Sequence, residues 1–259
     1  MNIIQDKLNF FSLFKRNFLY KFKKKTNIDL DDVNVNDKKL DDLFYYYGTD
    51  KANYIKSNNR IGHGFSKFYE THLSKFKKKN KITILELGSY SGASASAFLK
   101  YFPNSEIYCL DINLLNIKYC SKKMHVFGIN SSDPKSINKF LANINFYEKI
   151  KNFDIIIDDG SHIQSDQLLN LNFFYKFINE GGFYIIEDYK FPKYFKHLND
   201  VNDLRIDELI KKIIDKDYFS SKFISKITID NLNNNTNIFE HKGNGKHSDI
   251  VFFEKKTIS

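Results

Sequence analysis

The chain has 259 residues, of which 42% are hydrophobic, and a formal net charge of +9. A chain of this length can bury a large core, and one α/β domain with an appendage is expected rather than two domains. Its two cysteines, Cys109 and Cys120, give neither a disulfide framework nor metal-ligand spacing, which fits a reducing cytoplasm. No stretch approaches the roughly 18 uninterrupted apolar residues of a membrane span, and the N-terminus has no clean signal-peptide core, so we expect a cytoplasmic protein.

The positive charge is concentrated in the N-terminal region. Residues 1–80 hold 17 Lys and Arg against 9 Asp and Glu, whereas residues 81–259 hold 23 against 22. An enzyme acting on RNA or DNA more often carries its basic residues around the active cleft. The body of the protein, residues 81–259, is therefore expected to be nearly neutral and not to bind nucleic acid.

Residues 1–25 combine an apolar stripe with many basic residues, and this pattern predicts an amphipathic helix. Such a helix can pack on the body or on a second subunit, or it can lie on the anionic inner face of a membrane. The stripe is rich in Phe, which favours packing. Residues 26–42, rich in Asp and Asn, predict a linker or a short capped helix, so residues 1–43 form an N-terminal extension. The apolar stripe consists of Ile4, Leu8, Phe11, Phe14, Phe18 and Phe22.

A first strand is predicted at residues 82–87, and a loop of glycines and small residues, ELGSYSGASAS, begins within it. Gly88 and Gly92 allow the backbone to pass close under a ligand, and the helix that follows presents its N-terminus there. Tyr90 stands where a dinucleotide-binding loop has its middle glycine, which disfavours pyrophosphate. The next strand, residues 107–110, ends on Asp111, which is placed to accept hydrogen bonds from ribose hydroxyls.

Further elements follow in alternation. A strand at residues 125–129 leads to a helix that Asp133 caps and Pro134 begins, and the loop before this helix would face the adenine of a bound nucleoside. Alternating strands and helices predict an α/β fold, a Rossmann-like, doubly wound, mostly parallel seven-stranded sheet. The remaining predictions are helices at 164–178 and 203–217 and an aromatic, basic loop at 189–197 that would cover the ligand-binding edge of the sheet. A closing hairpin is predicted from strands 223–230 and 250–253, separated by a mobile Asn-rich segment, 231–237.

Two apolar runs, IIIDDGSH and FYIIED, each stop on a pair of carboxylates. Open α/β sheets keep their ligands at the carboxyl ends of such strands. If the two strands are neighbours, four acids meet beside a histidine, and clustered acids repel one another unless a cation or shared protons compensate. The pattern therefore suggests a hard, oxygen-loving metal with a base nearby. The alternative is that Asp159 or Ser161 only caps the following helix.

Several motifs carry a resemblance to a known family. The order GTDK, a later His and Tyr-Glu, LELGSYSG, LDIN, SSDP, DDGSH and IIED resembles the metal-dependent sugar O-methyltransferases that modify macrolide and rhamnosyl groups, within the class I S-adenosylmethionine-dependent methyltransferases. It covers roughly residues 44–255, and DDGSH followed by IIED is its specific part. The resemblance implies a methyltransferase domain at residues 44–259 that uses S-adenosylmethionine and Mg²⁺ or another divalent cation.

The resemblance also implies roles for individual residues. The general base is His162, and the metal ligands are Asp159, Glu187 and Asp188. Departures stand at Asn130, where the family often has Asp, and at Asp166, where it often has a second His. The expected cofactor-binding residues are Glu86, Gly88, Ser89, Gly92, Asp111, Ile112, Ser132, Asp133 and Asp158, and the expected substrate-binding residues are His63, Tyr69 and Tyr189.

The expected function is metal-assisted methylation of a hydroxyl on a sugar, a nucleotide-linked sugar or a glycan, by a protein that could be a homo-oligomer. A methyltransferase for nucleic acid or another small molecule is the alternative, but an Asn-Pro-Pro-Tyr-like motif and a catalytic Cys motif are missing from the sequence. A non-catalytic or hydroxylase-like relative of the same fold is a further alternative.

Overall fold

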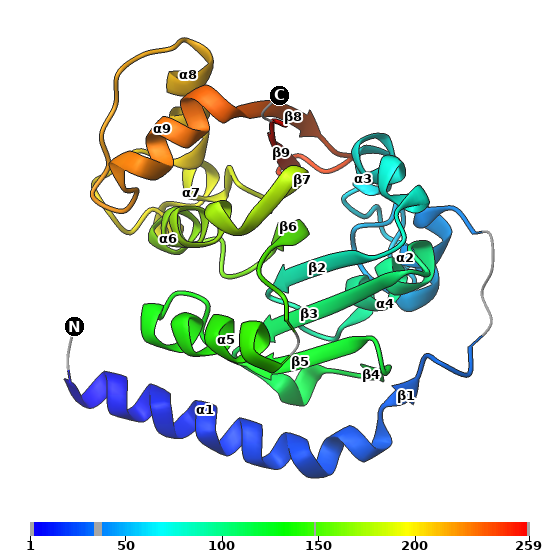
Figure 1. Cartoon of the computed structure of the whole chain (residues 1–259). Coiled ribbons are helices and arrows are strands. Elements are labelled where there is room, and N and C mark those ends of the chain that lie inside the picture. The colour runs from blue at the N-terminus through cyan, green and yellow to red at the C-terminus, as the bar shows by residue number, and fades with distance from the viewer. Residues whose placement is uncertain (1–2, 34–37, 148, 258–259) are drawn as a thin grey trace.

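The computed structural model describes residues 3–33, 38–147 and 149–257. Its centre is a seven-stranded sheet in the order β5-β3-β2-β6-β7-β9-β8 (Figure 1). Neighbouring strands from β5 to β7 are parallel, while β9 runs antiparallel to both β7 and β8. The predicted Rossmann-like, mostly parallel sheet is confirmed. The strands are β2 (Ile82–Leu87), β3 (Ser105–Asp111), β5 (Met124–Gly128), β6 (Phe153–Asp158), β7 (Ile178–Glu187), β8 (Thr236–Lys242) and β9 (Asp249–Lys255).

The central strands β2 and β6 explain where ligands can bind. Both are buried at every position, as expected for apolar runs covered on both faces. From β2 the chain first proceeds outward through β3 and β5, and then returns to place β6 on the other side of β2. This reversal is a topological switch point, which opens a crevice at the carboxyl ends of β2 and β6.

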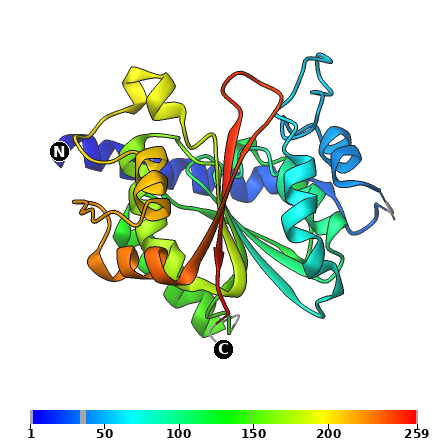
Figure 2. The same cartoon turned by 90° about the horizontal axis from the view of Figure 1, so that it is seen from above.

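Helices cover both faces of the sheet (Figure 2). One buried cluster joins the sheet to the first group of helices, and a second cluster joins it to the other group. The short helix α7 (Phe191–Tyr194) follows β7. The first group is α2 (Leu40–Tyr47), α3 (Ser66–Leu73) and α4 (Ala93–Tyr101); the second is α5 (Pro134–Tyr147), α6 (Gln164–Phe174), α8 (Ile206–Ile214) and α9 (Lys226–Asn235).

Two predictions for the C-terminal third are wrong. Residues 223–230, predicted as a strand, mostly lie in α9, where the Ser225 hydroxyl caps the helix by accepting from the backbone N–H of Thr228 at 3.3 Å. The helix buries Ile229 and Leu232, so its β-branched residues serve a helical face. The Asn-rich segment 231–237 is not a separate connection, because it forms the end of α9 and the start of β8.

The N-terminal helix α1 (Ile3–Lys23) lies along the β5 edge of the molecule (Figure 1). It packs on the body, as predicted, but through polar contacts: Asn17 Nδ2 donates to Gly128 O at 2.9 Å, and Lys23 Nζ donates to Ile117 O. The expected direction of the Phe stripe is wrong, since Phe14 is 63% and Phe22 61% exposed. This edge of the body offers backbone carbonyl groups, which polar side chains satisfy and Phe cannot.

After α1 the chain makes a short strand, β1 (Ile28–Asp29), which pairs with β4 (Tyr119–Cys120). Residues 34–37 of the predicted linker lie outside the described residues. Within the described part of the chain, no helix combines the length and the apolar character that crossing a membrane requires.

Candidate active site

The two acid pairs meet at one edge of the sheet, as predicted. Strand β6 pairs with β7 in parallel, and Asp158 lies opposite Ile186. Asp158 and Asp159 therefore lie beside Glu187 and Asp188. His162 is close by, with Nε2 at 3.7 Å from Asp159 Oδ1.

Sequence reasoning missed the residue that compensates these acids. Lys51 Nζ lies 2.5 Å from Asp159 Oδ2 and 2.6 Å from Glu187 Oε2, and the side chains of Lys51 and Glu187 are almost fully buried. Although burial opposes the charged form, the two carboxylates raise the pKa of Lys51 well above its usual value. The cation that this structure places between the acids is an ammonium group. Its signal in the sequence is the GTDK motif, which ends on Lys51.

Two of the predicted substrate residues hold acids in place instead. The Tyr69 hydroxyl donates to Glu187 Oε1, and His63 Nδ1 lies 3.3 Å from Asp188 Oδ1. Burial lowers the pKa of His63, but Asp188 outweighs it and brings the pKa to about 9. The third, Tyr189, is buried and donates its hydroxyl to Glu240, so its side chain is not available to an acceptor.

Backbone strain gathers at this edge. Tyr90, His162 and Asp188 have φ values of 44°, 56° and 49°. Residues other than glycine rarely adopt this left-handed backbone region, which costs each of them about 1 to 3 kcal/mol. Such residues persist where the surrounding structure holds them, and they cluster at functional sites.

The glycine loop lies directly beside the acids. Gly88 has φ 83°, and a Cβ atom on it would come within 2.1 Å of the carbonyl oxygen of Asp159. The Asp159 N–H donates to Leu87 O at 3.0 Å, which fixes the two loops together. Asp111 joins the same site, because its Oδ2 atom accepts from the Tyr90 N–H at 2.7 Å. The predicted nucleoside-binding and acid motifs therefore form one continuous site.

Buried acids line this site. Glu86 accepts from the Ser94 hydroxyl through Oε1, whereas its buried Oε2 makes no hydrogen bond to the described residues. Asp158 accepts from the Tyr184 hydroxyl at 3.0 Å, and burial raises the pKa of Asp158 to about 6. An oxygen such as Oε2 of Glu86 favours a donor from a ligand.

The other predicted cofactor positions lie around this loop and the next one. Ser89 is buried, Gly92 precedes α4 with φ 74°, and Ile112 is half exposed after β3. Asp133 caps α5 as predicted, by accepting from the Ser136 N–H at 3.1 Å. The Ser132 N–H donates to Asn130 Oδ1 at 3.0 Å, so the family departure at 130 still orders this turn.

The reading of Asp159 or Ser161 as only a helix cap is not supported. The N-cap residue of helix α6 is Ile163, which has no capping side chain, and the Ser165 N–H in the first turn donates instead to Asp200 Oδ1 at 3.0 Å. The Ser161 hydroxyl donates to Asp166 at 2.5 Å, which gives the second family departure a local role. The segment predicted to cover the site reaches it through Phe191, whose ring centroid is 5.0 Å from that of His162.

The donor chemistry of the acid cluster fits a divalent cation. Asp159, Glu187 and Asp188 offer hard carboxylate oxygens, and the buried Asp188 Oδ1 has the His63 ring 3.3 Å away but no hydrogen bond of good geometry among the described residues. Among the described residues, however, no three His, Cys, Asp or Glu side chains are grouped as a metal site. Lys51 and a metal ion would share the oxygens of Asp159 and Glu187.

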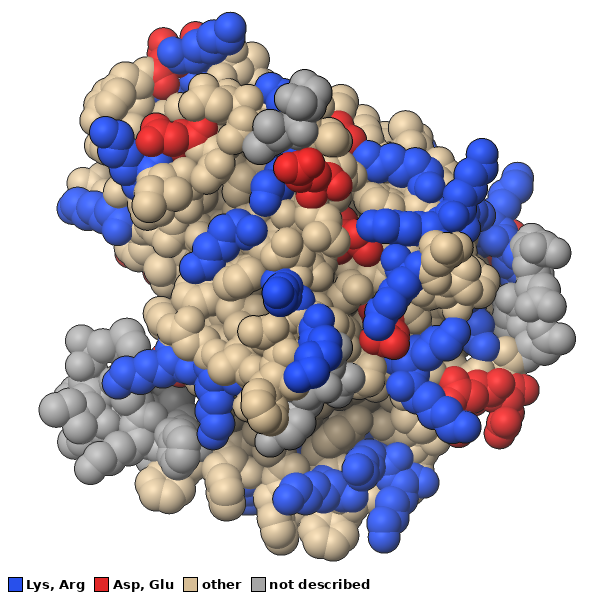
Figure 3. All heavy atoms as spheres, viewed as in Figure 1, with Lys and Arg blue, Asp and Glu red and all other residues tan. Residues whose placement is uncertain are grey.

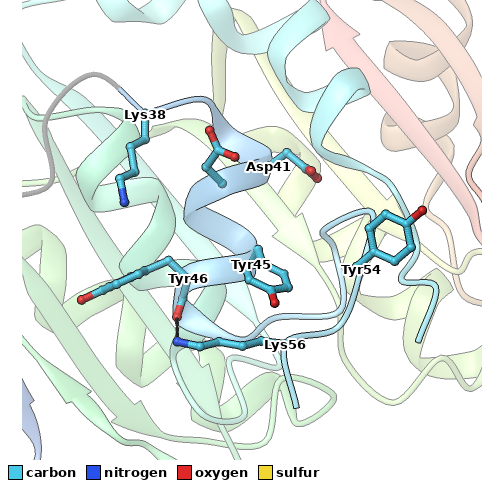
Figure 4. Close-up of a pocket in the computed structure, with 7 residues that line it drawn as sticks. Lys38, Asp41, Tyr45, Tyr46, Tyr54 and Lys56 are labelled. Carbon is cyan, nitrogen blue, oxygen red and sulfur yellow. Dashed lines mark hydrogen bonds between the residues drawn. The ribbon is translucent and has the colours of Figure 1, made fainter. Parts of the chain in front are cut away.

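A surface hollow beside α2 is lined by none of the predicted site residues (Figure 4). Its Asp41 accepts from the backbone N–H of Asn53 at 2.9 Å and from the Ser66 hydroxyl at 2.7 Å. These bonds fasten the loop that carries Lys51 to α2 and α3. The hollow is lined by Lys38, Asp41, Asp42, Tyr45, Tyr46, Tyr54 and Lys56.

No protein-family model matches the chain. It is 26% identical over 223 residues to L-olivosyl-oleandolide 3-O-methyltransferase of Streptomyces antibioticus, a match that covers 81% of this chain and 54% of that protein. It is 27% identical over 160 residues to mycinamicin VI 2''-O-methyltransferase of Micromonospora griseorubida, covering 58% of this chain and 35% of that protein. The chain thus spans about half or less of the length of these curated relatives.

Among solved structures, the chain resembles the methyltransferase MycE of the mycinamycin biosynthetic pathway in complex with Mg, SAH and mycinamycin VI. The TM-score is 0.60 at 22% identity, over 85% of this chain and 55% of that one. The two chains share a fold. The resemblance to sugar O-methyltransferases inferred from the motifs is confirmed by the two sequence relatives.

Proposed function

We propose that this chain transfers a methyl group from S-adenosylmethionine to a hydroxyl of a sugar, a nucleotide-linked sugar or a glycan, with residues 44–259 as the catalytic domain. One observation carries the proposal: the glycine loop touches the acid loop at Gly88 and Asp159, within reach of His162. A nucleoside-binding site and a candidate base therefore lie side by side. The sugar O-methyltransferases among the sequence relatives support the choice of acceptor.

The residues of the chain have distinct proposed roles. Asp111 accepts hydrogen bonds from the ribose hydroxyls, and the loop from Glu86 to Gly92 lies under the rest of the cofactor. His162 takes the proton of the acceptor hydroxyl. As the oxygen–carbon bond forms, the bond between carbon and sulfur breaks and the sulfur keeps the electron pair. Holding both reactants in line provides much of the rate.

The acid cluster has a second proposed role, which is to bind a cation. Asp159, Glu187 and Asp188 would hold a divalent cation, which when bound would stabilise negative charge on the acceptor oxygen. Lys51 and Tyr69 position Asp159 and Glu187, and His63 positions Asp188. Fixed partners of this kind keep carboxylates in one orientation.

The experiment that tests this function uses S-adenosylmethionine with a labelled methyl group, offered with nucleotide-linked sugars, glycans and RNA. Label is expected in the sugar-containing acceptors only. Label in RNA would contradict the proposed acceptor class. If none of the acceptors carries label and the chain does not bind S-adenosylmethionine, the proposed reaction itself is contradicted.

Replacing Asp111, which is partly buried, by Ala is expected to weaken S-adenosylmethionine binding by about 1 to 3 kcal/mol, the scale of a lost charge-assisted hydrogen bond. Calorimetry measures this affinity. The Asp111 side chain also accepts from the Tyr90 and Asn113 N–H groups, so Asp111→Asn is the control that keeps an acceptor for the loop. Unchanged affinity in Asp111→Ala would show that the ribose is held elsewhere.

A further inference from the structure

Helix α1 presents an apolar face to solvent. Phe14, Phe18 and Phe22 are 63%, 52% and 61% exposed, and Leu19 beside them is 41% exposed. The rings of Phe18 and Phe22 contact each other edge to face, with centroids 5.5 Å apart. Together these four residues form what we call the Phe face. Isolated exposed apolar residues are ordinary, but a contiguous row of them marks an interaction surface.

The opposite side of α1 is committed to the body. Asn17 donates to Gly128 O, Arg16 Nη1 lies 3.4 Å from Ile112 O, and Lys23 donates to Ile117 O. Gly128 ends β5, and Ile112 and Ile117 lie in the segment between β3 and β5. The helix is therefore fixed in rotation, and the outward direction of the Phe face is a feature of the fold.

The charge around the Phe face has one sign. Residues 11–25 contain six Lys and Arg and no Asp or Glu. At about 100° per residue, Lys21 falls next to Phe14 at one side of the Phe face and Lys15 falls between Phe22 and Leu19, and both lysines are exposed. Lys24 and Lys25 continue the basic surface beyond the helix. In Figure 3, uncharged side chains project at the lower edge, where α1 runs in Figure 1, with Lys and Arg side chains beside them.

We propose that the Phe face of α1 docks the protein on an anionic bilayer surface. In that position the Phe rings enter the boundary between headgroups and acyl chains, and the flanking lysines reach the anionic headgroups. A second copy of the chain fits less well. Pairing two Phe faces would bring two sets of lysines together, and residues 11–25 contain no acid that could compensate them.

The surface does not depend on the proposed reaction, and its test needs no acceptor. The full chain is sedimented with vesicles of phosphatidylglycerol and phosphatidylcholine, and with vesicles of phosphatidylcholine alone, at low and high salt. We expect binding to the anionic vesicles only, weakened by salt because the lysine contribution is screened.

Two double variants separate the apolar and charged contributions. Phe14→Ser with Phe18→Ser is expected to weaken binding at least tenfold, since two rings no longer leave water. Lys15→Glu with Lys21→Glu is expected to weaken it by roughly 30-fold or more, because each basic residue near such a surface contributes about a factor of five.

The matched controls lie on other elements. Tyr218→Ser with Ile227→Ser removes two apolar side chains that are 90% and 75% exposed, and Lys222→Glu with Lys226→Glu reverses two exposed charges. Both controls should bind vesicles like the parent chain. Absence of vesicle binding in the parent chain, or equal losses in controls and α1 variants, would overturn the proposal. So would a dimer seen by light scattering that Phe14→Ser with Phe18→Ser dissolves, since a second copy would then cover the Phe face.

Discussion

Asp159→Asn is expected to lower turnover by about 10²- to 10³-fold, the scale of losing one group that stabilises charge in the transition state. The substitution keeps the shape of the side chain but removes the charge that Lys51 and a divalent cation would share. Cofactor affinity should stay close to that of the parent chain, because the glycine loop contacts the Asp159 backbone and not its carboxylate. Steady-state turnover and calorimetry with S-adenosylmethionine measure the two effects.

Removing divalent metal ions tests whether the same acids act by binding a cation. Chelation should abolish methyl transfer, and Mg²⁺ should restore it, because hard carboxylate oxygens prefer such an ion. Full turnover in chelator would contradict metal assistance. If Lys51→Gln then abolished that turnover, the buried ammonium would be the only cation that the acids need. Equal loss of turnover and of cofactor affinity in Asp159→Asn would indicate a folding defect instead.

The sheet and its acid edge were predictable because they depend on local patterns. Continuous apolar runs identify buried parallel strands, and the residue after each run falls at the carboxyl end. Lys51 was not predictable in this way. It lies 108 residues from Asp159 and 136 from Glu187, and nothing in local periodicity reports that a loop before the first core strand folds back over the acids.

The Phe stripe of α1 and helix α9 show what residue patterns alone do not predict, namely burial and the choice between helix and strand. Periodicity correctly identified the apolar side of α1, but it does not say whether that side is buried. The body decides this, because it offers the carbonyl groups of Gly128 and Ile117 to the polar side of the helix. In α9 the β-branched residues favoured a strand, whereas the Ser225 cap and the contacts of Ile229 and Leu232 determined a helix.

His162→Asn is expected to lower turnover by about 10²- to 10⁴-fold, the usual contribution of a general base. Asn is the informative replacement because His162 has φ 56°, a conformation that Asn accepts more readily than most residues. The loop should therefore keep its shape, and the melting temperature and cofactor affinity should be unchanged. His162→Ala would mix the loss of the base with backbone strain.

The control for this experiment is His197→Asn, which changes an exposed histidine in the segment that follows α7. Its turnover should match that of the parent chain. The imidazole of His162 has neighbours on two sides, Asp159 at 3.7 Å and the Phe191 ring. A base that takes the proton of one particular hydroxyl needs such a fixed position. Parent-like turnover in His162→Asn would remove His162 from the mechanism. The acid cluster and Lys51 would then have to lower the barrier by stabilising the acceptor oxygen, with solvent taking the proton.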